Sequence, residues 1–403
     1  MNPTLHVVGA GLAGLAAAVA AARAGTHVVL HEAAGHAGGR CRSFRDATID
    51  RVIDNGTHLM LGVNRTALAF ARAVGGIEAM ERNEAAFPFH DLADGGQWVL
   101  SAAALTARPF QLLRACGLPW TAESQTVADR LEASSLFRRV WEPLCVAALN
   151  TAADEASARM FATLLRAAIA SGKRGLEPWV FPAGLSSALV APAVATLAAH
   201  GAELRFRHRL QAVDGDRLEF DDGPLSFGAD DRVVLALPPW ALAGMVEDLP
   251  DLSTRAIVNA HFRLEVPAQL PGGKPFLGVV GGFSQWLALR DDVISVTVSA
   301  ADALAAETAE TVGATLWGEV RRIIGQPDRQ QPPTRIMKER RATLAHTPEA
   351  VAKRPGHLTR FPNVFLAGDW LANPWPCTIE AAISSGLAAA SLALRRPALA
   401  FAP

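Results

Sequence analysis

The sequence predicts an α/β protein in which a Rossmann-like domain is interwoven with a second domain made of an antiparallel sheet and a helical cap. Three observations predict this class. A strand, a glycine loop, a helix and a second strand open the chain, a long stretch of helical patterns interrupts it, and a glycine-containing strand and helix follow near its end. At 403 residues the chain is too long for one simple core, so two domains that share it in alternating segments are expected.

The opening unit has the order and spacing of a dinucleotide-binding fingerprint. Residues 5–8 and 28–30 predict short apolar strands, residues 15–24 predict an alanine-rich helix, and the second strand is closed by an acid, Glu32. The loop between the first strand and the helix reads Gly-x-Gly-x-x-Gly. A glycine loop alone fits many turns, but this context favours dinucleotide binding over a plain βαβ turn.

Each position of the glycine loop has a physical role. Gly9 permits the tight turn out of the strand, Gly11 lets the backbone touch a pyrophosphate because it has no Cβ, and Gly14 lets the helix pack close to the sheet. The helix start at Leu12 and Ala13 offers free N–H groups and the positive end of the helix dipole to the phosphates.

Two features after the second strand refine the dinucleotide site. Glu32 is placed to accept hydrogen bonds from ribose hydroxyl groups, and its charge disfavours the 2′-phosphate of NADP. A glycine-rich turn follows, Gly38-Gly39-Arg40, which can bring an arginine and backbone amides against the far side of a pyrophosphate. Taken alone, that turn would be interpreted as an ordinary loop.

Composition and charge exclude several classes of function. The chain is 50% hydrophobic and 19% charged, and its net charge of −1 includes no long run of either sign, so no nucleic-acid partner is expected. The cysteines form neither a C-x-x-C pair nor a metal-ligand spacing, which predicts a reduced cytoplasmic protein without a metal site. The apolar run of residues 9–22 is too short to span a bilayer, and no secretion signal or transmembrane helix is expected.

The middle of the chain alternates between the two domains. Residues 76–180 predict a helical cap, with helical patterns at 101–116, 126–131, 136–149 and 156–170. Residues 181–240 predict a return to the nucleotide domain, with a helix to residue 199 and strands at 203–206, 210–213, 217–220 and 232–236.

Residues 241–345 predict the antiparallel sheet of the second domain. They contain strand patterns at 257–266, 276–280, 293–299 and 335–341, together with one long helical pattern at 303–324. The nucleotide domain is therefore expected to occupy residues 1–75, 181–240 and 346–403.

The last segment predicts which dinucleotide binds. A strand runs into Gly368 and Asp369, and a helix of small residues begins near Thr378 and Ile379. Gly368 permits close approach, Asp369 can bind ribityl hydroxyls, and the helix start can direct N–H groups at the flavin edge where charge accumulates on reduction. Alone, this segment would be an ordinary strand and helix. Paired with the N-terminal fingerprint it favours FAD, because an NAD domain needs no such closing segment.

With these motifs, the sequence resembles the FAD-dependent amine-oxidase and phytoene-desaturase superfamily. Within it, the sequence is similar to the squalene-associated FAD-dependent desaturases, the hydroxysqualene dehydroxylases of bacterial hopanoid synthesis. The resemblance covers nearly the full length. The FAD motifs specify the cofactor but not the substrate and lie at residues 9–32, 38–40 and 366–386; weaker family signals lie at 141–151, 181–185 and 339–343.

The resemblance implies further contacts with FAD. It places the segment Gly56-Thr57-His58 beside the flavin ring and the backbone of Val213 against adenine. Cys377 would lie close to the flavin, where the family pattern has a small residue, so its reactivity is left open. His58 is the candidate general acid because its segment should reach the flavin, and a hydrogen-bonded structural histidine is the alternative.

The resemblance also implies a reaction. Members of the family are understood to convert hydroxysqualene to squalene, so we expect reductive removal of an allylic hydroxyl from a C30 isoprenoid held in a dry, apolar tunnel. The alternatives are an oxidative desaturase of a carotenoid or terpenoid, an amine oxidase, and a flavin- or lipid-binding protein without turnover. The absence of tyrosine disfavours an amine oxidase, which frames its amine between aromatic rings. The electron donor and the oligomeric state stay open.

Such a substrate resides in bilayers, so we expect a cytoplasmic protein attached peripherally to the inner membrane. The candidate contact is residues 99–120, where five large apolar residues cluster beside two arginines: Phe110, Leu112, Leu113, Leu118 and Trp120, with Arg108 and Arg114. A buried cap helix is the alternative for this stretch.

Overall fold

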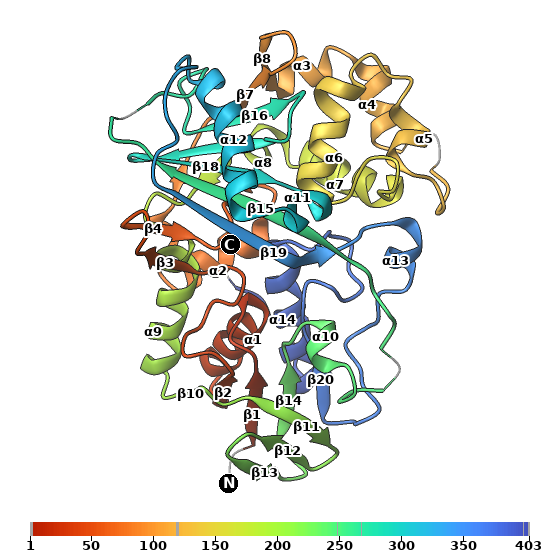
Figure 1. Cartoon of the computed structure of the whole chain (residues 1–403). Coiled ribbons are helices and arrows are strands. Elements are labelled where there is room, and N and C mark those ends of the chain that lie inside the picture. The colour runs from red at the N-terminus through yellow and green to blue at the C-terminus, as the bar shows by residue number, and fades with distance from the viewer. Residues whose placement is uncertain (1–2, 118–120, 248, 267, 398, 402–403) are drawn as a thin grey trace.

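The computed structural model describes residues 3–117, 121–247, 249–266, 268–397 and 399–401. Its first sheet is parallel, with five strands in the order β10-β2-β1-β14-β20. These strands are β1 (Thr4–Val8), β2 (His27–Glu32), β10 (Glu203–Phe206), β14 (Arg232–Leu235) and β20 (Val364–Leu366). They come from the three chain segments predicted to share the nucleotide domain, and they lie together at the lower end of the molecule in Figure 1.

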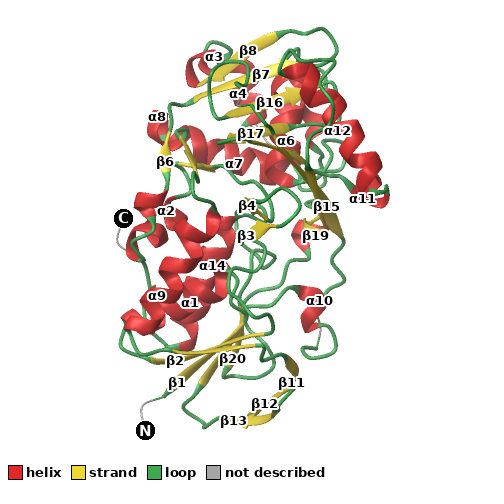
Figure 2. Cartoon of the chain, turned by 60° about the vertical axis from the view of Figure 1, so that its left-hand side comes forward, coloured by secondary structure: helices red, strands yellow, loops and turns green. Residues whose placement is uncertain are grey.

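Helices rich in small apolar residues cover one face of this sheet (Figure 2). They are α1 (Leu12–Arg23), α9 (Ala191–Ala199) and α14 (Ile379–Ala393). The backbones of α1 and α14 approach closely at Gly386, where a Cβ would overlap the carbonyl oxygen of Ala13. The alanine run of α1 therefore packs against a second helix as well as against the sheet, which explains why every residue from Leu12 to Ala22 is buried.

A seven-stranded sheet forms the second domain, in the order β19-β15-β18-β17-β16-β7-β8. Its strands are β7 (Ala86–Asp91), β8 (Gln97–Ser101), β15 (Thr254–Arg263), β16 (Phe276–Val280), β17 (Trp286–Arg290), β18 (Val293–Val298) and β19 (Thr334–Leu344). All neighbouring strands are antiparallel except β16 and β7, which are parallel. The segment predicted as the helical cap thus also supplies two strands of this sheet.

The two faces of the seven-stranded sheet have different characters. Alternate residues of β15, including Val258 and Phe262, form a hydrophobic core with α11 (Asp302–Ala306) and α12 (Ala309–Ile323). Asn259, which follows Val258, belongs to the opposite face and contacts Thr57 of the nucleotide domain. This second face of the sheet packs against the cap at Trp286 and looks toward the predicted flavin site at Asn259.

The cap consists of short helices packed on the β7 and β16 end of the same sheet. They are α3 (Ala102–Thr106), α4 (Pro109–Ala115), α5 (Val127–Leu131), a π-helical turn (Phe137–Trp141), α6 (Glu142–Leu149), α7 (Ala158–Ala170) and α8 (Gly172–Gly175). Their core includes the fully buried Trp141, Phe161 and Phe89 of β7. Within the described part of the chain, no helix is both long and apolar enough to cross a bilayer.

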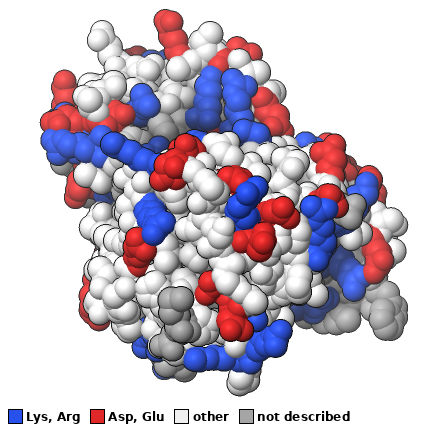
Figure 3. All heavy atoms as spheres, turned by 90° about the horizontal axis from the view of Figure 1, so that it is seen from below, with Lys and Arg blue, Asp and Glu red and all other residues white. Residues whose placement is uncertain are grey.

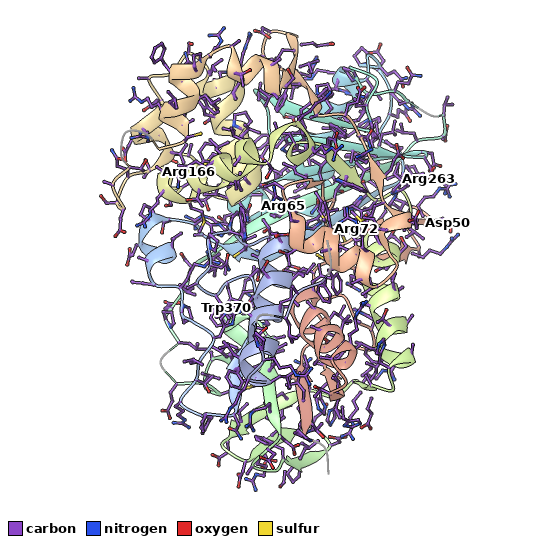
Figure 4. All side chains as sticks on the ribbon, turned by 180° about the vertical axis from the view of Figure 1, so that it is seen from behind. Asp50, Arg65, Arg72, Arg166, Arg263 and Trp370 are labelled. Atoms are coloured by element: carbon purple, nitrogen blue, oxygen red, sulfur yellow. The ribbon has the colours of Figure 1, made fainter. Side chains whose placement is uncertain are left out.

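Small strands and helices complete the two domains. They are β3 (Ser43–Asp46), β4 (Arg51–Asp54), β5 (Met60–Leu61), α2 (Arg65–Ala73), β6 (Glu81–Arg82), β9 (Pro178–Val180), β11 (Leu210–Asp214), β12 (Arg217–Phe220), β13 (Gly223–Ser226), α10 (Pro239–Leu242) and α13 (Pro348–Ala352). The β3–β4 hairpin meets the end of β15, where Arg263 donates to the carbonyl oxygen of Ile49 over 3.2 Å. Figure 4 shows Arg263 and Asp50 together at this edge.

The predicted long helix at 303–324 is two helices in the structure. α11 ends at Ala306, and Thr308 caps the start of α12 by accepting a hydrogen bond from the backbone N–H of Thr311.

The face of the molecule seen from below in Figure 3 carries acidic and basic side chains interspersed, rather than a field of one sign.

Candidate active site

The glycine loop of the fingerprint has the geometry that its spacing predicts. Gly9 has a positive φ of 102° and donates its N–H to the carbonyl oxygen of His31 over 2.7 Å. A Cβ at Gly14 would overlap the carbonyl oxygen of Gly9, so this position requires glycine. A Cβ at Gly11, by contrast, would meet no protein atom within 4 Å. The space in front of Gly11 is therefore open.

Backbone donors point into that open space. Among the described residues, no acceptor pairs with the backbone N–H groups of Gly11, Leu12, Ala13 and Gly14, and no side chain caps α1. Unpaired N–H groups at a helix start, with the positive end of the helix dipole, form a binding site for an anion such as a pyrophosphate.

Glu32 lies at the end of β2, as predicted, and orders the loops around it. Its two carboxylate oxygens accept hydrogen bonds of 2.7 Å each from the backbone N–H groups of Ala10 and Ala34. A carboxylate has about four lone-pair positions, so each oxygen keeps capacity for a ribose hydroxyl. Val213, predicted to lie against adenine, is buried in β11 and packs with Leu218 in a hydrophobic cluster. Its contact with adenine stays a prediction.

The Gly38-Gly39-Arg40 turn lies directly over the fingerprint loop. The backbone N–H of Gly38 donates to the carbonyl oxygen of Ala10 over 2.8 Å, and a Cβ at Gly39 would come within 3.3 Å of the Cα of Gly11. Both glycines have positive φ angles, of 112° and 54°. The turn is therefore part of the same site and not a separate loop.

Arg40 extends from this turn to the C-terminal motif. Its guanidinium contacts both carboxylate oxygens of Asp369, at 2.7 and 2.8 Å, and donates to the backbone carbonyl of Ala342. Desolvation opposes the charge of Arg40, but the Asp369 carboxylate keeps the pKa of the guanidinium above its ordinary value. Arg40 and Asp369 line one pocket together with Trp240 and Cys377.

The C-terminal motif is held by contacts that sequence reasoning missed. Arg354 is buried, and its guanidinium donates to the backbone carbonyls of Asp369, Trp370 and Trp375, so one side chain shapes the loop that carries Asp369. The indole of Trp370, labelled in Figure 4, occupies the space that a Cβ at Gly368 would need. The only sequence signal for Arg354 was a lone arginine before a proline, which is not specific.

The start of α14 offers a second set of free donors. Thr378 caps the helix by accepting from the N–H of Ala381 over 3.3 Å, while the N–H groups of Ile379 and Glu380 pair with no acceptor among the described residues. The Glu380 carboxylate instead accepts from the backbone N–H groups that start α2, at Thr66 and Ala67. The helix start is therefore open, while its acid serves a neighbouring helix.

Cys377, just before α14, is an inert thiol in this setting. Burial, with a further contribution from the nearby Asp369 carboxylate, raises its pKa to about 12, so the thiolate is not populated at neutral pH. Its backbone N–H donates to Nε2 of His346 over 2.9 Å, and Nδ1 of that histidine donates to the carbonyl oxygen of Leu149 over 2.6 Å. His346 therefore connects the cap to the C-terminal motif in one fixed, neutral tautomer.

His58 lies in the segment of the nucleotide domain that contacts Asn259 of the seven-stranded sheet. Its Nδ1 donates to the carbonyl oxygen of Gly56 over 2.6 Å, which leaves Nε2 as an acceptor. Burial lowers the pKa of His58, yet its side chain keeps exposed surface. At neutral pH the ring is thus an acceptor, and its predicted role as general acid stays a prediction.

These residues fit a bound FAD. Two helix starts with free N–H groups, the open space at Gly11 and the acceptor capacity of Glu32 match the phosphate and ribose parts of that cofactor. The contact of Asp369 with the ribityl chain stays a prediction. When bound, FAD supplies a two-electron redox centre. The fold and the site together define an FAD-dependent oxidoreductase.

Comparison with known proteins gives the same class. Residues 121–394 match the family model of the flavin containing amine oxidoreductases, and residues 7–74 match that of the NAD(P)-binding Rossmann-like domain. The solved structure of cyclohexylamine oxidase from Brevibacterium oxydans is similar in fold, with a TM-score of 0.71, 14% sequence identity, and coverage of 98% of this chain and 99% of that one.

Curated relatives narrow the class. The hydroxysqualene dehydroxylase of Rhodopseudomonas palustris is 40% identical and that of Sinorhizobium fredii 39%, each match covering 98% of this chain and 99% of the relative. The chain therefore belongs to the hydroxysqualene dehydroxylase family, within the flavin-containing amine oxidoreductases.

Proposed function

We propose that this chain reductively removes the allylic hydroxyl of hydroxysqualene to give squalene, as a step of squalene and hopanoid synthesis. The observation that carries the proposal is the match, over 98% of the chain, to relatives named hydroxysqualene dehydroxylase, combined with a site that fits FAD. The conversion breaks a C–O bond, forms a C–H bond and releases water, so it consumes two electrons and two protons for each molecule of substrate.

The chain's own part in this reaction is to bind, orient and dehydrate the substrate. On the face of the seven-stranded sheet opposite α11 and α12, we expect the apolar side chains of Ile257 and Met337, which share this face by strand register, to support the isoprenoid. An allylic hydroxyl ionises more readily than an unactivated one because the resulting charge is delocalised. A water-poor cleft beside the redox centre therefore suits this chemistry.

Lipid analysis of cells tests the proposal. A hydroxysqualene-producing synthase would be expressed with this chain, without it, and with the Gly11→Val variant as a matched control that blocks the pyrophosphate space. Squalene should accumulate only in cells carrying the wild-type chain. Cells that accumulate a more desaturated product would favour an oxidative desaturase, and cells that keep hydroxysqualene unchanged would count against any action on this alcohol.

We further propose that the protein acts at the cytoplasmic face of the inner membrane, attached through the cap. Phe110 and Leu113 of α4 are 86% and 48% exposed, and Val99 of the edge strand β8 is 53% exposed. Residues 95–122 contain no acid but include Arg108 and Arg114, so charge complements an anionic lipid surface. The predicted contributions of Leu118 and Trp120 lie outside the described residues.

Flotation with vesicles of anionic lipid tests this attachment. Wild-type protein should float with the vesicles, and Phe110→Ser with Leu113→Ser should leave most of the protein in the soluble fraction. Leu358→Ser is the matched control, because Leu358 is 71% exposed but lies in the nucleotide domain. Wild-type protein that stays soluble at low and high salt alike would contradict the proposal.

A further inference from the structure

Asn259 is a buried amide on the face of the seven-stranded sheet opposite α11 and α12. It is 1% exposed and lies in β15 opposite Met337 of β19 and Thr297 of β18, while Thr297 in turn lies opposite Trp286 of β17. Met337 and Trp286 are apolar, so Asn259 and Thr297 form a polar pair within an otherwise apolar row. Burying a polar pair in such a surface is costly unless the pair is hydrogen-bonded, and this pair is.

Two hydrogen bonds fix the orientation of the Asn259 amide. Its Oδ1 accepts from the hydroxyl of Thr297 over 2.8 Å and from the backbone N–H of Thr57 over 3.4 Å. The hydroxyl group of Thr297 has one proton and donates it in this bond. Because Oδ1 is held toward these two donors, the Nδ2 group must point to the other side of the amide.

The Nδ2 group is a donor without a protein partner. Among the described residues, no acceptor pairs with it. It lies 3.5 Å from the position that a Cβ on Gly56 would occupy, and Cε1 of His58 also lies 3.5 Å from that position. The missing side chain of Gly56 thus leaves a gap that a fixed donor and an imidazole both border.

The His58 ring contributes the complementary group. Its Nδ1 proton is committed to the carbonyl oxygen of Gly56, so Nε2, next to Cε1, carries a free lone pair. A hydroxyl group both accepts and donates a hydrogen bond. The Asn259 N–H at the gap, with the Nε2 lone pair next to the Cε1 atom that borders it, therefore offers the polarity that an alcohol needs and that a hydrocarbon cannot use.

We propose that Asn259 and His58 form the recognition site for the hydroxyl group of the substrate, with Gly56 keeping the space between them open. The Nδ2 of Asn259 donates to the hydroxyl oxygen, and Nε2 of His58 accepts the hydroxyl proton. Thr297 and the backbone of Thr57 act as positioning groups that hold the amide. This inference rests on the proposed function, because it assigns a place to the alcohol that the reaction consumes.

This site distinguishes the substrate from the product. In this site the carbinol carbon of the substrate lies next to residues 56–58, the segment predicted to lie beside the flavin ring. After the hydroxyl is lost, Asn259 and His58 have no hydrogen-bond partner on the product. The hydrocarbon product then leaves the buried Asn259 amide and the His58 imidazole unpaired, which weakens its binding relative to the alcohol.

Equilibrium binding to the oxidised holoprotein tests the proposal without requiring turnover. Hydroxysqualene and squalene would be offered in detergent micelles to wild type, Asn259→Leu and Gly56→Ala. Wild type should prefer the alcohol roughly tenfold, as one or two net hydrogen bonds allow. Both variants should lose that preference, while their affinity for squalene changes less than about twofold.

The two variants fail for different reasons, which keeps the test decisive. Asn259→Leu leaves Thr57 and Thr297 without their acceptor and should reduce the flavin content. Gly56→Ala preserves every hydrogen bond and adds a methyl at ordinary contact distances from Asn259 and His58. Gly318→Ala, at a glycine with no neighbour within 4 Å, is the matched control and should keep the full preference.

The outcomes separate this inference from the proposed function. Retention of the alcohol preference in Gly56→Ala, or no preference in wild type, overturns the recognition site even if cells convert hydroxysqualene to squalene. Cells that do not convert hydroxysqualene overturn the proposed function, whatever the binding experiment shows.

Discussion

Arg40 and Asp369 lie 329 residues apart in sequence and form an ion pair in which one guanidinium nitrogen contacts both carboxylate oxygens, at 2.7 and 2.8 Å. The pair joins the first and last motifs of the nucleotide domain. The Asp369 side chain is largely buried, with 8% of its surface exposed, whereas the Arg40 side chain is 39% exposed. Both side chains line the same pocket. The pair brings the glycine-rich turn and the strand end together before any ligand binds, so it pre-organises the predicted FAD site.

Breaking this pair should destabilise the protein even without FAD. Arg40→Met would leave the Asp369 carboxylate buried without a partner, so the free energy of unfolding should fall by about 1–3 kcal/mol. This is less than the loss of a fully buried ion pair would cost, because the Arg40 side chain is partly exposed. Urea denaturation of the apoprotein measures this. Arg45→Met is the matched control: its pair with Asp50 is exposed on both sides, and its loss should cost less than about 1 kcal/mol. Equal losses in the two variants would contradict the pre-organising role.

Replacing two glycines of the fingerprint should have different effects, one on FAD binding and the other on folding. Gly11 has an ordinary φ of −70° and open space beyond it, so Gly11→Val should fold but bind no FAD, because the valine fills the space that the pyrophosphate needs. Gly14→Val should prevent normal folding, because its Cβ would overlap the carbonyl oxygen of Gly9. Circular dichroism and flavin content after purification separate the two effects. Full flavin occupancy in Gly11→Val would show that the phosphate site is elsewhere.

Flavin should be bound without a covalent link. Cys377 borders the pocket at Arg40, but burial raises its pKa to about 12, so the thiolate that attachment requires is absent at neutral pH. Acid precipitation should release the yellow cofactor into the supernatant, and Cys377→Ala should purify with the same flavin content as wild type. A pellet that retains flavin in the wild type but not in Cys377→Ala would establish a covalent bond.

Stability should fall as the pH drops below about 6.5. Burial lowers the pKa of His31 to about 3 and those of His261 and His346 to about 4, whereas in the unfolded chain each has an ordinary value near 6.5. The unfolded state therefore binds more protons between these values, and stability present above pH 6.5 is lost as the pH falls toward 3. Each histidine contributes at most about 1.4 kcal/mol per pH unit in this window.

Urea denaturation between pH 7 and pH 5 measures this slope. His31→Leu should lower stability at pH 7, because it removes the bonds of His31 to His6 and His208. It should also flatten the pH dependence by the share of one histidine, at most about 1.4 kcal/mol per pH unit. His27→Gln, an exposed position on the same strand, is the control and should leave the slope unchanged. A slope that His31→Leu does not alter would show that other groups govern the acid response.

The parts of the fold that sequence predicted well depend on local spacing. The roles of Gly9, Gly11 and Gly14 follow from a strand, a loop and a helix that are adjacent in sequence, and the start of α14 at Thr378 follows from its own capping residue. The split between α11 and α12 was missed, because Thr308 lies in a run that continues the helical pattern on both sides.

The parts that sequence could not predict depend on register between distant segments. Asn259 meets Thr57, 202 residues away, only because β15 pairs with β18 and β19 in one particular register. The five-residue strand β17 was also missed, since nothing in Trp286–Arg290 distinguishes it from a loop until its neighbours are known. His346 has no motif around it, and its role as a bridge between cap and C-terminal segment appears only in three dimensions.

The most direct test of the central claim is a single anaerobic turnover. The purified holoprotein would be reduced with dithionite, freed of excess reductant and mixed with hydroxysqualene in detergent, and the lipid products would be identified by mass spectrometry. The account predicts squalene in an amount that matches the bound flavin, together with recovery of the oxidised-flavin absorbance. Hydroxysqualene recovered unchanged from a fully reduced, FAD-loaded protein would contradict it.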